Sequence, residues 1–361
     1  MKILVAPLNW GLGHATRCIP IVEALRRQRA EVILAADGAA YDLLKLEFPD
    51  LEIHTLPAYN IRYPFRSMLL SMAVQMPKIL RGAINEHFWL KKFLKNTPID
   101  VVISDNRYGF FSRHVHSIFM THQVNILIPC PILQPFVNVV NHFFIKKFDA
   151  CWVPDVAVEP NLAGILSHGN FSKKLNIKYL GILSRFKKQV FEKKYKAAFV
   201  LSGPEPQRSI LEKKIRQELS IVKNENDTYL LIRGTSKPFD LDQVRNLDNM
   251  MDNLEIHDML TSPVLNQKIL ESDVVICRSG YSSIMDLVCL QKAAILIPTP
   301  GQTEQEYLAT ELMRRNKFFS QTQDTFDLSK AMTTYSSFKN FTDLAIENKT
   351  LEEIISELLK N

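Results

Sequence analysis

Short apolar runs alternate with amphipathic stretches along most of this chain of 361 residues. In the first half, strands are predicted at residues 3–7, 31–36, 51–56, 100–104 and 124–129. The alternation restarts further along, with strands predicted at residues 197–201, 228–233, 254–257, 274–277 and 294–298. Continuous apolar runs separated by helices are typical of buried parallel strands joined by crossover helices. The pattern therefore predicts an α/β chain with two wound halves.

The two halves are predicted to be two Rossmann-like domains, because the length exceeds what one hydrophobic core usually serves. Their join falls near the charged stretch 184–196. We expect an N-terminal domain at residues 1–185 and a C-terminal domain at residues 190–345. Residues 346–361 include an amphipathic helix at 350–359, which we expect to pack back towards the N-terminal domain.

Composition narrows the class of protein. With 46% hydrophobic and 23% charged residues, collagen-like, disordered and coiled-coil classes are excluded. No apolar run reaches the roughly 18–20 residues of a membrane span, and Met1 leads into a strand-like run without signal-peptide features. We therefore expect a soluble, cytoplasmic protein. The five cysteines are scattered without the spacing of a zinc site, so no metal is predicted.

The net charge of +6 is concentrated in the first half, where residues 1–185 carry +8 and the rest carry −2. A basic half suggests an anionic partner. Residues 61–95 interleave apolar and basic side chains, which fits docking on the anionic inner face of a membrane. A buried helical pair with solvated charges remains an equal alternative, although the similar stretch 136–148 slightly favours the membrane. Nucleic acid is not expected as a partner, because no recognised binding motif is present.

Candidate chemistry lies where strands end, because ligands of open α/β sheets bind at the carboxyl ends of strands. The loop after the first strand brings His14 to the start of a helix, where an imidazole can act as a general base towards a hydroxyl. Asp105 follows the fourth predicted strand and could hold the other imidazole nitrogen. Helix capping by His14 and turn capping by Asp105 remain the alternatives.

The second half has three comparable loops. Ser202 and Gly203 follow its first strand and could present backbone N–H groups to a phosphate. The run RSGYSSIMD at 278–286 combines a glycine turn with hydroxyls at a helix start, which is typical of an anion site. The run PTPGQTEQE follows the next strand and supplies amide and carboxylate groups for sugar hydroxyls. Taken one at a time, each loop also fits ordinary capping and turn chemistry.

Taken together, these loops resemble the GT-B glycosyltransferases. The runs RSGYSSIMDL and PTPGQTEQE are similar to the C-terminal signature of the MurG-like, family 28 branch, which includes peptidoglycan N-acetylglucosaminyl transferase and monogalactosyldiacylglycerol synthase. The N-terminal GLGHATR loop and the pair His122-Gln123 fit the same template. The resemblance implies two Rossmann-like domains whose parallel sheets face each other across a cleft.

The resemblance also implies roles for individual residues. His14 and Asp105 are the expected catalytic pair. The expected donor-binding residues are Ser202, Gly203, Arg278, Ser279, Gly280, Ser282, Ser283, Asp286, Gln305 and Glu306, with uracil resting on backbone near 260–262. The expected acceptor-binding residues are Gly11, Gly13, Arg17, Arg107, Tyr108, His122 and Gln123. Asp286 stands in place of a ribose-binding glutamate, and Glu306 in place of the second residue of a Gln-Gln pair.

The implied function is an inverting hexosyl or N-acetylhexosaminyl transferase. It would move a sugar from a nucleotide-diphosphate donor, with UDP-sugar as the first expectation, to a hydroxyl of a lipid-linked or cell-envelope acceptor. A helix N-terminus can stabilise the leaving diphosphate, so no obligatory metal or other cofactor is expected. Two alternatives stay open: a UDP-sugar 2-epimerase and a non-catalytic sugar-nucleotide-binding protein.

Overall fold

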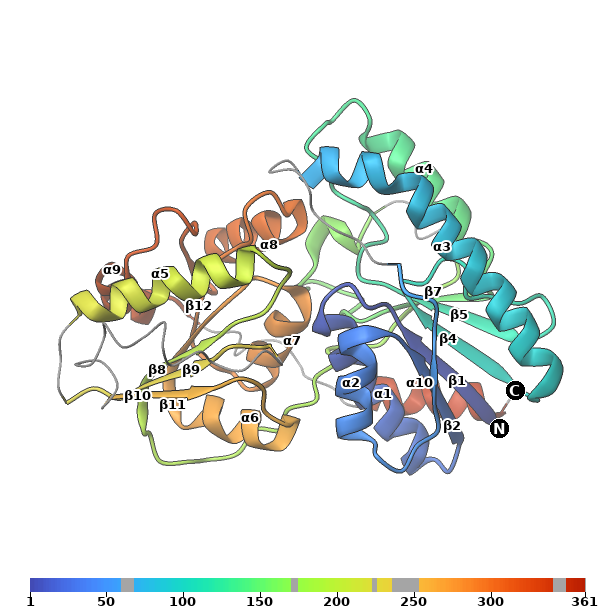
Figure 1. Ribbon diagram of the computed structural model, residues 1–361, viewed down its shortest axis with the longest axis horizontal. Helices are drawn as coiled ribbons and strands as arrows, with labels where there is room; N and C mark the ends of the chain where they lie inside the picture. Colours follow the sequence, from blue (N-terminus) through green and yellow to red (C-terminus); the bar gives the residue numbers. More distant parts are fainter. Residues whose placement is uncertain (60–67, 170–174, 223–225, 236–252, 340–348, 361) are drawn as a thin grey trace. The chain divides into compact units, whose positions relative to one another are not determined.

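The computed structural model describes residues 1–59, 68–169, 175–222, 226–235, 253–339 and 349–360 (Figure 1). The chain divides into two compact units, and each is described by itself. Unit 1 combines Met1–Arg185 with Leu344–Asn361, and unit 2 is Phe186–Asp343. Each unit is built around one parallel sheet, so the predicted α/β class with two wound parallel sheets is confirmed.

Unit 1 contains a seven-stranded parallel sheet in the order β3-β2-β1-β4-β5-β6-β7. Its central strands are continuous apolar runs that are buried on both faces, as a covered parallel sheet requires. The strands are β1 (Lys2–Pro7), β2 (Glu31–Ala36), β3 (Ile53–Thr55), β4 (Val101–Asp105), β5 (His116–Met120), β6 (Ala150–Val153) and β7 (Ile177–Tyr179).

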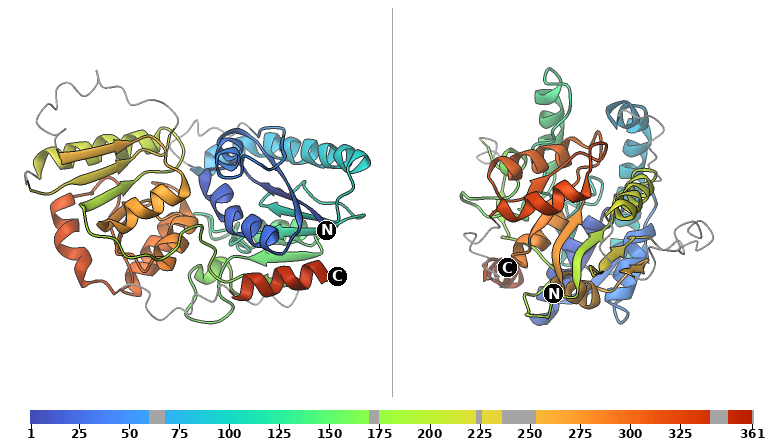
Figure 2. Two further views of the ribbon diagram at one scale, coloured as in Figure 1. Left: turned by 90° about the horizontal axis from the view of Figure 1, so that it is seen from below. Right: turned by 90° about the vertical axis from the view of Figure 1, so that its left-hand side faces the viewer.

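Helices connect and cover this sheet. The first of them begins directly after Gly11. Its φ of +99° is readily adopted by glycine and is strained for other residues. The last one returns from the end of the chain and packs on the first, as Figure 2 shows at its left. The helices of unit 1 are α1 (Leu12–Arg27), α2 (Gly38–Glu47), α3 (Met68–Asn96), α4 (Gln134–Ile145), the 3-10 turn η1 (Gly164–Leu166) and α10 (Lys349–Lys360).

Unit 2 repeats the plan with a six-stranded parallel sheet in the order β10-β9-β8-β11-β12-β13. The strands are β8 (Tyr195–Val200), β9 (Tyr229–Ile232), β10 (Leu254–His257), β11 (Ser272–Cys277), β12 (Ala294–Leu296) and β13 (Phe319–Ser320). The helices are α5 (Gln207–Ile221), α6 (Ser262–Leu270), α7 (Tyr281–Cys289), α8 (Thr303–Arg314), α9 (Leu328–Thr334) and the 3-10 turn η6 (Tyr335–Ser337). One apolar cluster, centred on Phe199, Leu231 and Ile276, forms the core on one face of this sheet.

One predicted strand is wrong. Residues 124–129 form a loop, and the fifth strand of the sheet is β5 at His116–Met120. Side chains of α4 form hydrogen bonds with the backbone of the loop. Asn138 accepts from the amide of Ile126 at 2.8 Å, and Gln134 accepts from that of Ile128 at 2.9 Å. These bonds satisfy amides that a strand would use in its ladder, so an apolar run can stay irregular here.

Candidate active site

The centre of the first sheet brings His14 and Asp105 together. Neighbours β1 and β4 lie where the strand order reverses, and such switch points are where ligands bind in open α/β sheets. The loop after β1 leads to His14 in the first turn of α1, and Asp105 is the last residue of β4. Nδ1 of His14 lies 3.0 Å from Oδ1 of Asp105. The structure therefore joins the two residues that the sequence paired as catalytic.

Arg17 connects His14 and Asp105 to a third side chain, His122. It lies one helical turn after His14, and its Nε donates to Oδ2 of Asp105 at 2.7 Å while Nη2 donates to Oδ1. Its Nη1 lies 2.8 Å from Nδ1 of His122, which must accept because a guanidinium has only donors. With 2% of its side chain exposed, Arg17 is enclosed by these partners. Arg17 and His122 are both buried, and contact of either side chain with an acceptor stays a prediction.

Burial and charge set the protonation of the pair. Desolvation lowers the pKa of His14 below its usual 6.5, Asp105 acts in the opposite direction, and Arg17 lowers it further. Desolvation alone would raise the pKa of Asp105, but Arg17 and His14 outweigh it and hold the pKa at about 2. At neutral pH the site therefore combines a neutral imidazole with an ionised carboxylate.

The tautomer of His14 decides what the imidazole can do. Its Nδ1 lies 3.0 Å from Oδ1 of Asp105 and 2.9 Å from Nη2 of Arg17. A proton on Nδ1 is donated to Asp105 and leaves Nε2 as a basic lone pair, whereas a proton on Nε2 makes Nδ1 an acceptor for Arg17. Nε2 forms no hydrogen bond with the described residues. The ring has 15% of its side chain exposed, so it is accessible to a small reactant.

Arg107 is buried and Tyr108 is half-buried, and both side chains bond to other parts of unit 1. Arg107 is fully buried, donates to Pro7 O at 2.8 Å, and forms ion pairs with Asp37 and Glu86. The hydroxyl of Tyr108 donates to Asn141 Oδ1 at 2.7 Å. Binding of an acceptor by these two side chains stays a prediction, and their polar groups have partners within the fold.

The remaining acceptor candidates lie near the His14 loop. Gly11 is exposed and directly precedes α1, and the carbonyl of Gly13 accepts from the hydroxyl of Thr16 at 3.0 Å. Gln123 is half-buried, and its backbone amide donates to Thr121 Oγ1 at 3.0 Å. The structure thus gives the two glycines a place beside His14, in the loop that leads into α1.

The second sheet has its own switch point, between β8 and β11. The turn Ser202-Gly203 follows β8, and Arg278-Ser279-Gly280 follows β11. Gly280 caps α7 without a side-chain hydrogen bond, which leaves the first N–H groups of that helix without the usual capping side chain. Half-buried Ser282, Ser283 and Asp286 follow within the first turns of α7. The donor-binding candidates therefore gather at one edge of the sheet, where a helix N-terminus favours an anion.

Arg278 is buried at this edge. Its side chain is 1% exposed and donates to neutral oxygens: the carbonyls of Gln207, Ile297 and Pro298, and Oε1 of Gln323. Burial lowers its pKa to about 10. Its guanidinium joins the start of α5, the loop after β12 and the loop at Gln323, and it pairs with no carboxylate among the described residues. Contact of this guanidinium with the donor stays a prediction.

Gln305 and Glu306 hold the loop that precedes α8. Oε1 of Gln305 accepts from the amide of Thr299 at 2.9 Å, and its carbonyl accepts from Ser279 Oγ at 2.8 Å. Oε1 of Glu306, an exposed residue, accepts from the amide of Gly301 at 2.8 Å. Thr299 was not among the residues predicted from the sequence. Its position, three residues after the end of β12, is the feature that could have indicated it.

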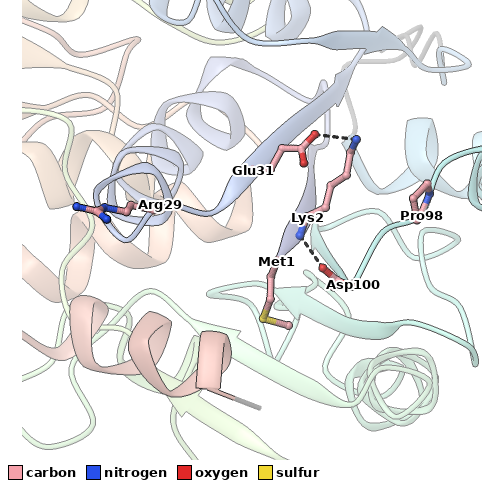
Figure 3. Close-up of a pocket in the computed structure, with 6 residues that line it drawn as sticks. All are labelled: Met1, Lys2, Arg29, Glu31, Pro98 and Asp100. Atoms are coloured by element: carbon pink, nitrogen blue, oxygen red, sulfur yellow. Dashed lines mark hydrogen bonds and ion pairs between the residues drawn. The ribbon is translucent and has the colours of Figure 1, made fainter.

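A depression at the opposite edge of the first sheet offers no comparable site. It is lined by Met1, Lys2, Arg29, Glu31, Pro98 and Asp100 at the amino ends of the strands (Figure 3). Lys2 pairs with Glu31 at 2.7 Å through its side chain and donates to Asp100 at 2.6 Å through its backbone amide. The side-chain charges of Lys2 and Glu31 therefore already neutralise one another. Within the described ranges, no cluster of three or more His, Cys, Asp or Glu is arranged to hold a metal ion.

Comparisons with known proteins agree with this geometry. Residues 197–353 match the Glycosyltransferase family 28 C-terminal domain. A protein described as an uncharacterized glycosyltransferase of Methanosarcina acetivorans is 25% identical over 334 residues, covering 86% of this chain and 81% of that protein. The family domain and this relative are transferases, and they give the epimerase hypothesis no support.

Solved structures share the fold at low sequence identity. The glycotransferase of kitacinnamycin superposes with a TM-score of 0.63 at 14% identity, over 99% of this chain and 94% of that one. MurG of Acinetobacter baumannii gives 0.59 at 13% identity, over 100% and 99%. The glycosyltransferase VinC, solved in complex with DTDP, gives 0.57 at 10% identity, over 100% and 94%. Residues 197–353 are therefore similar to the glycosyltransferase family 28 C-terminal domain, and the whole chain shares the fold of these solved glycosyltransferases.

Proposed function

We propose that this protein transfers a hexosyl or N-acetylhexosaminyl group, with inversion, from a nucleotide-diphosphate sugar to a hydroxyl of a lipid-linked or cell-envelope acceptor. UDP-sugar is the first candidate donor. The observation that carries the proposal is the network of His14, Asp105 and Arg17 at the switch point of the first sheet. A neutral imidazole held by an ionised carboxylate is what general-base activation of a hydroxyl needs.

The proposed reaction is a single displacement, in which the network of His14, Asp105 and Arg17 takes up one proton. The acceptor oxygen forms a bond to the anomeric carbon as the bond from that carbon to the diphosphate oxygen breaks. The acceptor proton passes to Nε2 of His14, and Asp105 stabilises the resulting imidazolium through Nδ1. The nucleoside diphosphate leaves with the electron pair of the broken bond. This role requires the His14 tautomer with its proton on Nδ1. Asp105 favours that tautomer because its Oδ1 accepts a hydrogen bond from Nδ1.

The donor is assigned to unit 2 by the character of its β8 and β11 edge. The N-terminus of α7, the Ser202-Gly203 turn and the buried positive charge of Arg278 all favour a diphosphate there. The complex of VinC with DTDP supports a nucleoside diphosphate as the ligand class. We assign leaving-group stabilisation to these groups and not to an obligatory metal ion, so activity should survive EDTA. We assign the binding of the donor's nucleobase to the backbone near residues 260–262.

The acceptor is assigned to unit 1, whose α3 has an unusual surface. Apolar side chains at four-residue spacing, Leu80, Ile84 and Phe88, are 46–64% exposed. The stripe runs into exposed lysines at positions 91, 92 and 95, while Leu90 on the other face is fully buried. This arrangement differs from a helix buried on all sides. The predicted residues 61–67 of the same stretch lie outside the described residues.

Helix α4 repeats that design. Phe136, Val139 and Phe143 are 60–68% exposed along one stripe, and Lys146 and Lys147 follow it. Both helices stand on the upper side of unit 1 in Figure 1 and in the right-hand view of Figure 2. Apolar stripes that end in lysines fit partial insertion into an anionic bilayer. No helix of the described residues has the length and apolarity to cross a membrane. We therefore propose peripheral binding to an anionic inner membrane face, from the cytoplasm, with a lipid-linked acceptor.

The test is a transfer assay with matched variants. Wild-type protein is incubated with UDP-, GDP-, dTDP- or CDP-sugars and a total lipid extract of an envelope, with and without EDTA. We expect one sugar nucleotide to release its diphosphate only when lipid is present, to give a product of inverted anomeric configuration, and to be unaffected by EDTA. His14→Ala should lower turnover about a hundredfold or more and leave the dissociation constant for the diphosphate nearly unchanged. The exposed His114→Ala serves as the control.

Two results would contradict the proposal. Equal turnover by wild type and His14→Ala would show that His14 is not the general base. Nucleotide binding without transfer, whatever the acceptor, would favour the non-catalytic sugar-nucleotide-binding protein.

A further inference from the structure

One hydroxyl at the donor edge of unit 2 has no partner. Thr299 is 2% exposed, and its Oγ1 forms no hydrogen bond with any described residue. Its backbone is fixed, because the amide of Thr299 donates to Oε1 of Gln305 at 2.9 Å. Neighbouring Ser279 differs, since its hydroxyl donates to the carbonyl of Gln305 at 2.8 Å. Of these two hydroxyls, therefore, only that of Thr299 lacks a partner among the described residues.

The hydroxyl faces an open position. Gly203 has a φ of +101°, and the nearest atom to the place that a Cβ would take there is Oγ1 of Thr299, at 3.9 Å. Gly203 follows β8 and Thr299 follows β12, and between these strands lies β11, whose loop opens α7. Gln305 links Thr299 to Ser279 in that loop. The hydroxyl thus belongs to the same edge as the uncapped helix N-terminus.

The charge at this edge favours an anion. Arg278 is buried, its Nε also lacks a partner, and its other bonds go to neutral oxygens. A buried cation without a carboxylate is stabilised by an incoming negative charge. A buried hydroxyl without a hydrogen bond carries a desolvation cost, so an acceptor atom supplied by a ligand recovers that cost.

We propose that Thr299 is a donor-binding residue whose hydroxyl donates a hydrogen bond to a phosphoryl oxygen of the nucleoside diphosphate, beside Gly203. The inference rests on the proposed function and adds a residue to it. Arg278 acts at longer range, as a positive charge behind the loops, and does not touch the ligand.

The test compares three proteins by calorimetric titration: wild type, Thr299→Val and Thr299→Ser. Valine keeps the shape of threonine and lacks the hydroxyl, whereas serine keeps the hydroxyl. The probes are UDP, dTDP and GDP, with the matching nucleosides as controls that lack phosphate. We expect Thr299→Val to bind the preferred diphosphate about 10- to 100-fold more weakly than wild type and the nucleoside equally well. Thr299→Ser should retain most of the affinity.

Thermal unfolding supplies a second readout that does not depend on titration. Without nucleotide, Thr299→Val should melt no lower than wild type, because it loses a hydroxyl that has no partner. At a saturating concentration of the diphosphate, wild type should gain more in melting temperature than Thr299→Val. Thr299→Ala repeats both measurements if the valine variant folds poorly.

Two outcomes would overturn the assignment and are distinguishable. Wild type and Thr299→Val binding the diphosphate equally would show that the hydroxyl serves a buried water, and the proposed function would stand. Wild type binding none of the diphosphates would overturn the proposed function together with this inference.

Discussion

Burial sets the chemistry of the charged residues at the end of β1 and β4. Asp105 has no exposed side-chain surface, yet Arg17 keeps it ionised with a pKa of about 2. His14 keeps a pKa below 6.5, with desolvation as the largest cause. An ionised carboxylate and a neutral imidazole at neutral pH follow from side chains that meet only through the pairing of β1 with β4.

The pH dependence of turnover follows from these shifts. The general base is active when His14 is neutral, so activity is present above its pKa and is lost as the pH falls through that pKa. Because the pKa of His14 is lowered, the acidic limb of kcat should have its midpoint below pH 6.5. Asp105 stays ionised through this range. A rate profile between pH 4.5 and 9 measures it.

The same profile contains its own control. The residual rate of His14→Ala should lack the acidic limb. A midpoint at or above pH 6.5, or the same limb in the variant, would assign the titration to another group.

The sequence could predict His14 and Asp105 because their strands are continuous apolar runs with an abrupt polar end. It could not separate them from Arg107, which also follows β4 and is fully enclosed by Asp37 and Glu86. The partners of Arg107 come from distant parts of the chain, so its burial is a property of the fold. Thr299 was missed for the same reason, since a hydroxyl without a partner is visible only when its surroundings are known.

At the scale of elements, every predicted strand except residues 124–129 is confirmed, whereas β5, β6, β7 and β13 were not predicted. β10 at Leu254–His257 lies where the pattern placed it, whereas β5 at His116–Met120 begins with a polar pair and was missed. The apolar run 124–129 was taken for a strand, but α4 supplies side chains to its backbone amides. Long-range hydrogen bonding of this kind leaves no periodic signal in the sequence.

Helix α3 makes a prediction about membranes. Charge reversal of Lys91, Lys92 and Lys95 to glutamate should weaken binding to vesicles that contain phosphatidylglycerol by at least about tenfold, because each cation near an anionic surface contributes about 1 kcal/mol. Binding of the wild type should also fall at high salt. Vesicle sedimentation measures both effects, and binding of the soluble donor should not change.

A matched variant separates this effect from net charge. Reversal of the exposed lysines 187, 213 and 330 in unit 2 changes the charge equally on other elements. If both triple variants bound vesicles as the wild type does, α3 would not be a docking surface.

At the scale of the whole molecule, the end of the chain belongs to the first unit. Ile355 of α10 is fully buried, and both Arg27, the last residue of α1, and Gln28, which follows it, bond to Glu352, Arg27 at 2.6 Å. Lys178 pairs with Glu357 at 3.0 Å. The two units thus have separate cores although the chain passes from one to the other twice.

Separate cores predict separate consequences. Ile355→Asp places a charge in the core of unit 1 and should lower its free energy of unfolding by about 3 kcal/mol or more, as denaturant titration would measure. Affinity for the nucleoside diphosphate, assigned to unit 2, should stay within about twofold. Glu353→Ala, at an exposed position of the same helix, should change neither quantity. A loss of nucleotide affinity in the Ile355 variant would show that the donor site depends on unit 1.

The proposed transfer requires that unit 2 binds a nucleoside diphosphate at the β8 and β11 edge. Its most direct test is a thermal-shift panel on the full chain with UDP, GDP, dTDP and CDP and their common sugar conjugates, with and without EDTA. We predict that one nucleotide raises the melting temperature selectively, by several degrees at about 100 times its dissociation constant, and that EDTA leaves the shift unchanged. No shift with any of them at millimolar concentration would contradict the donor site at Arg278–Asp286.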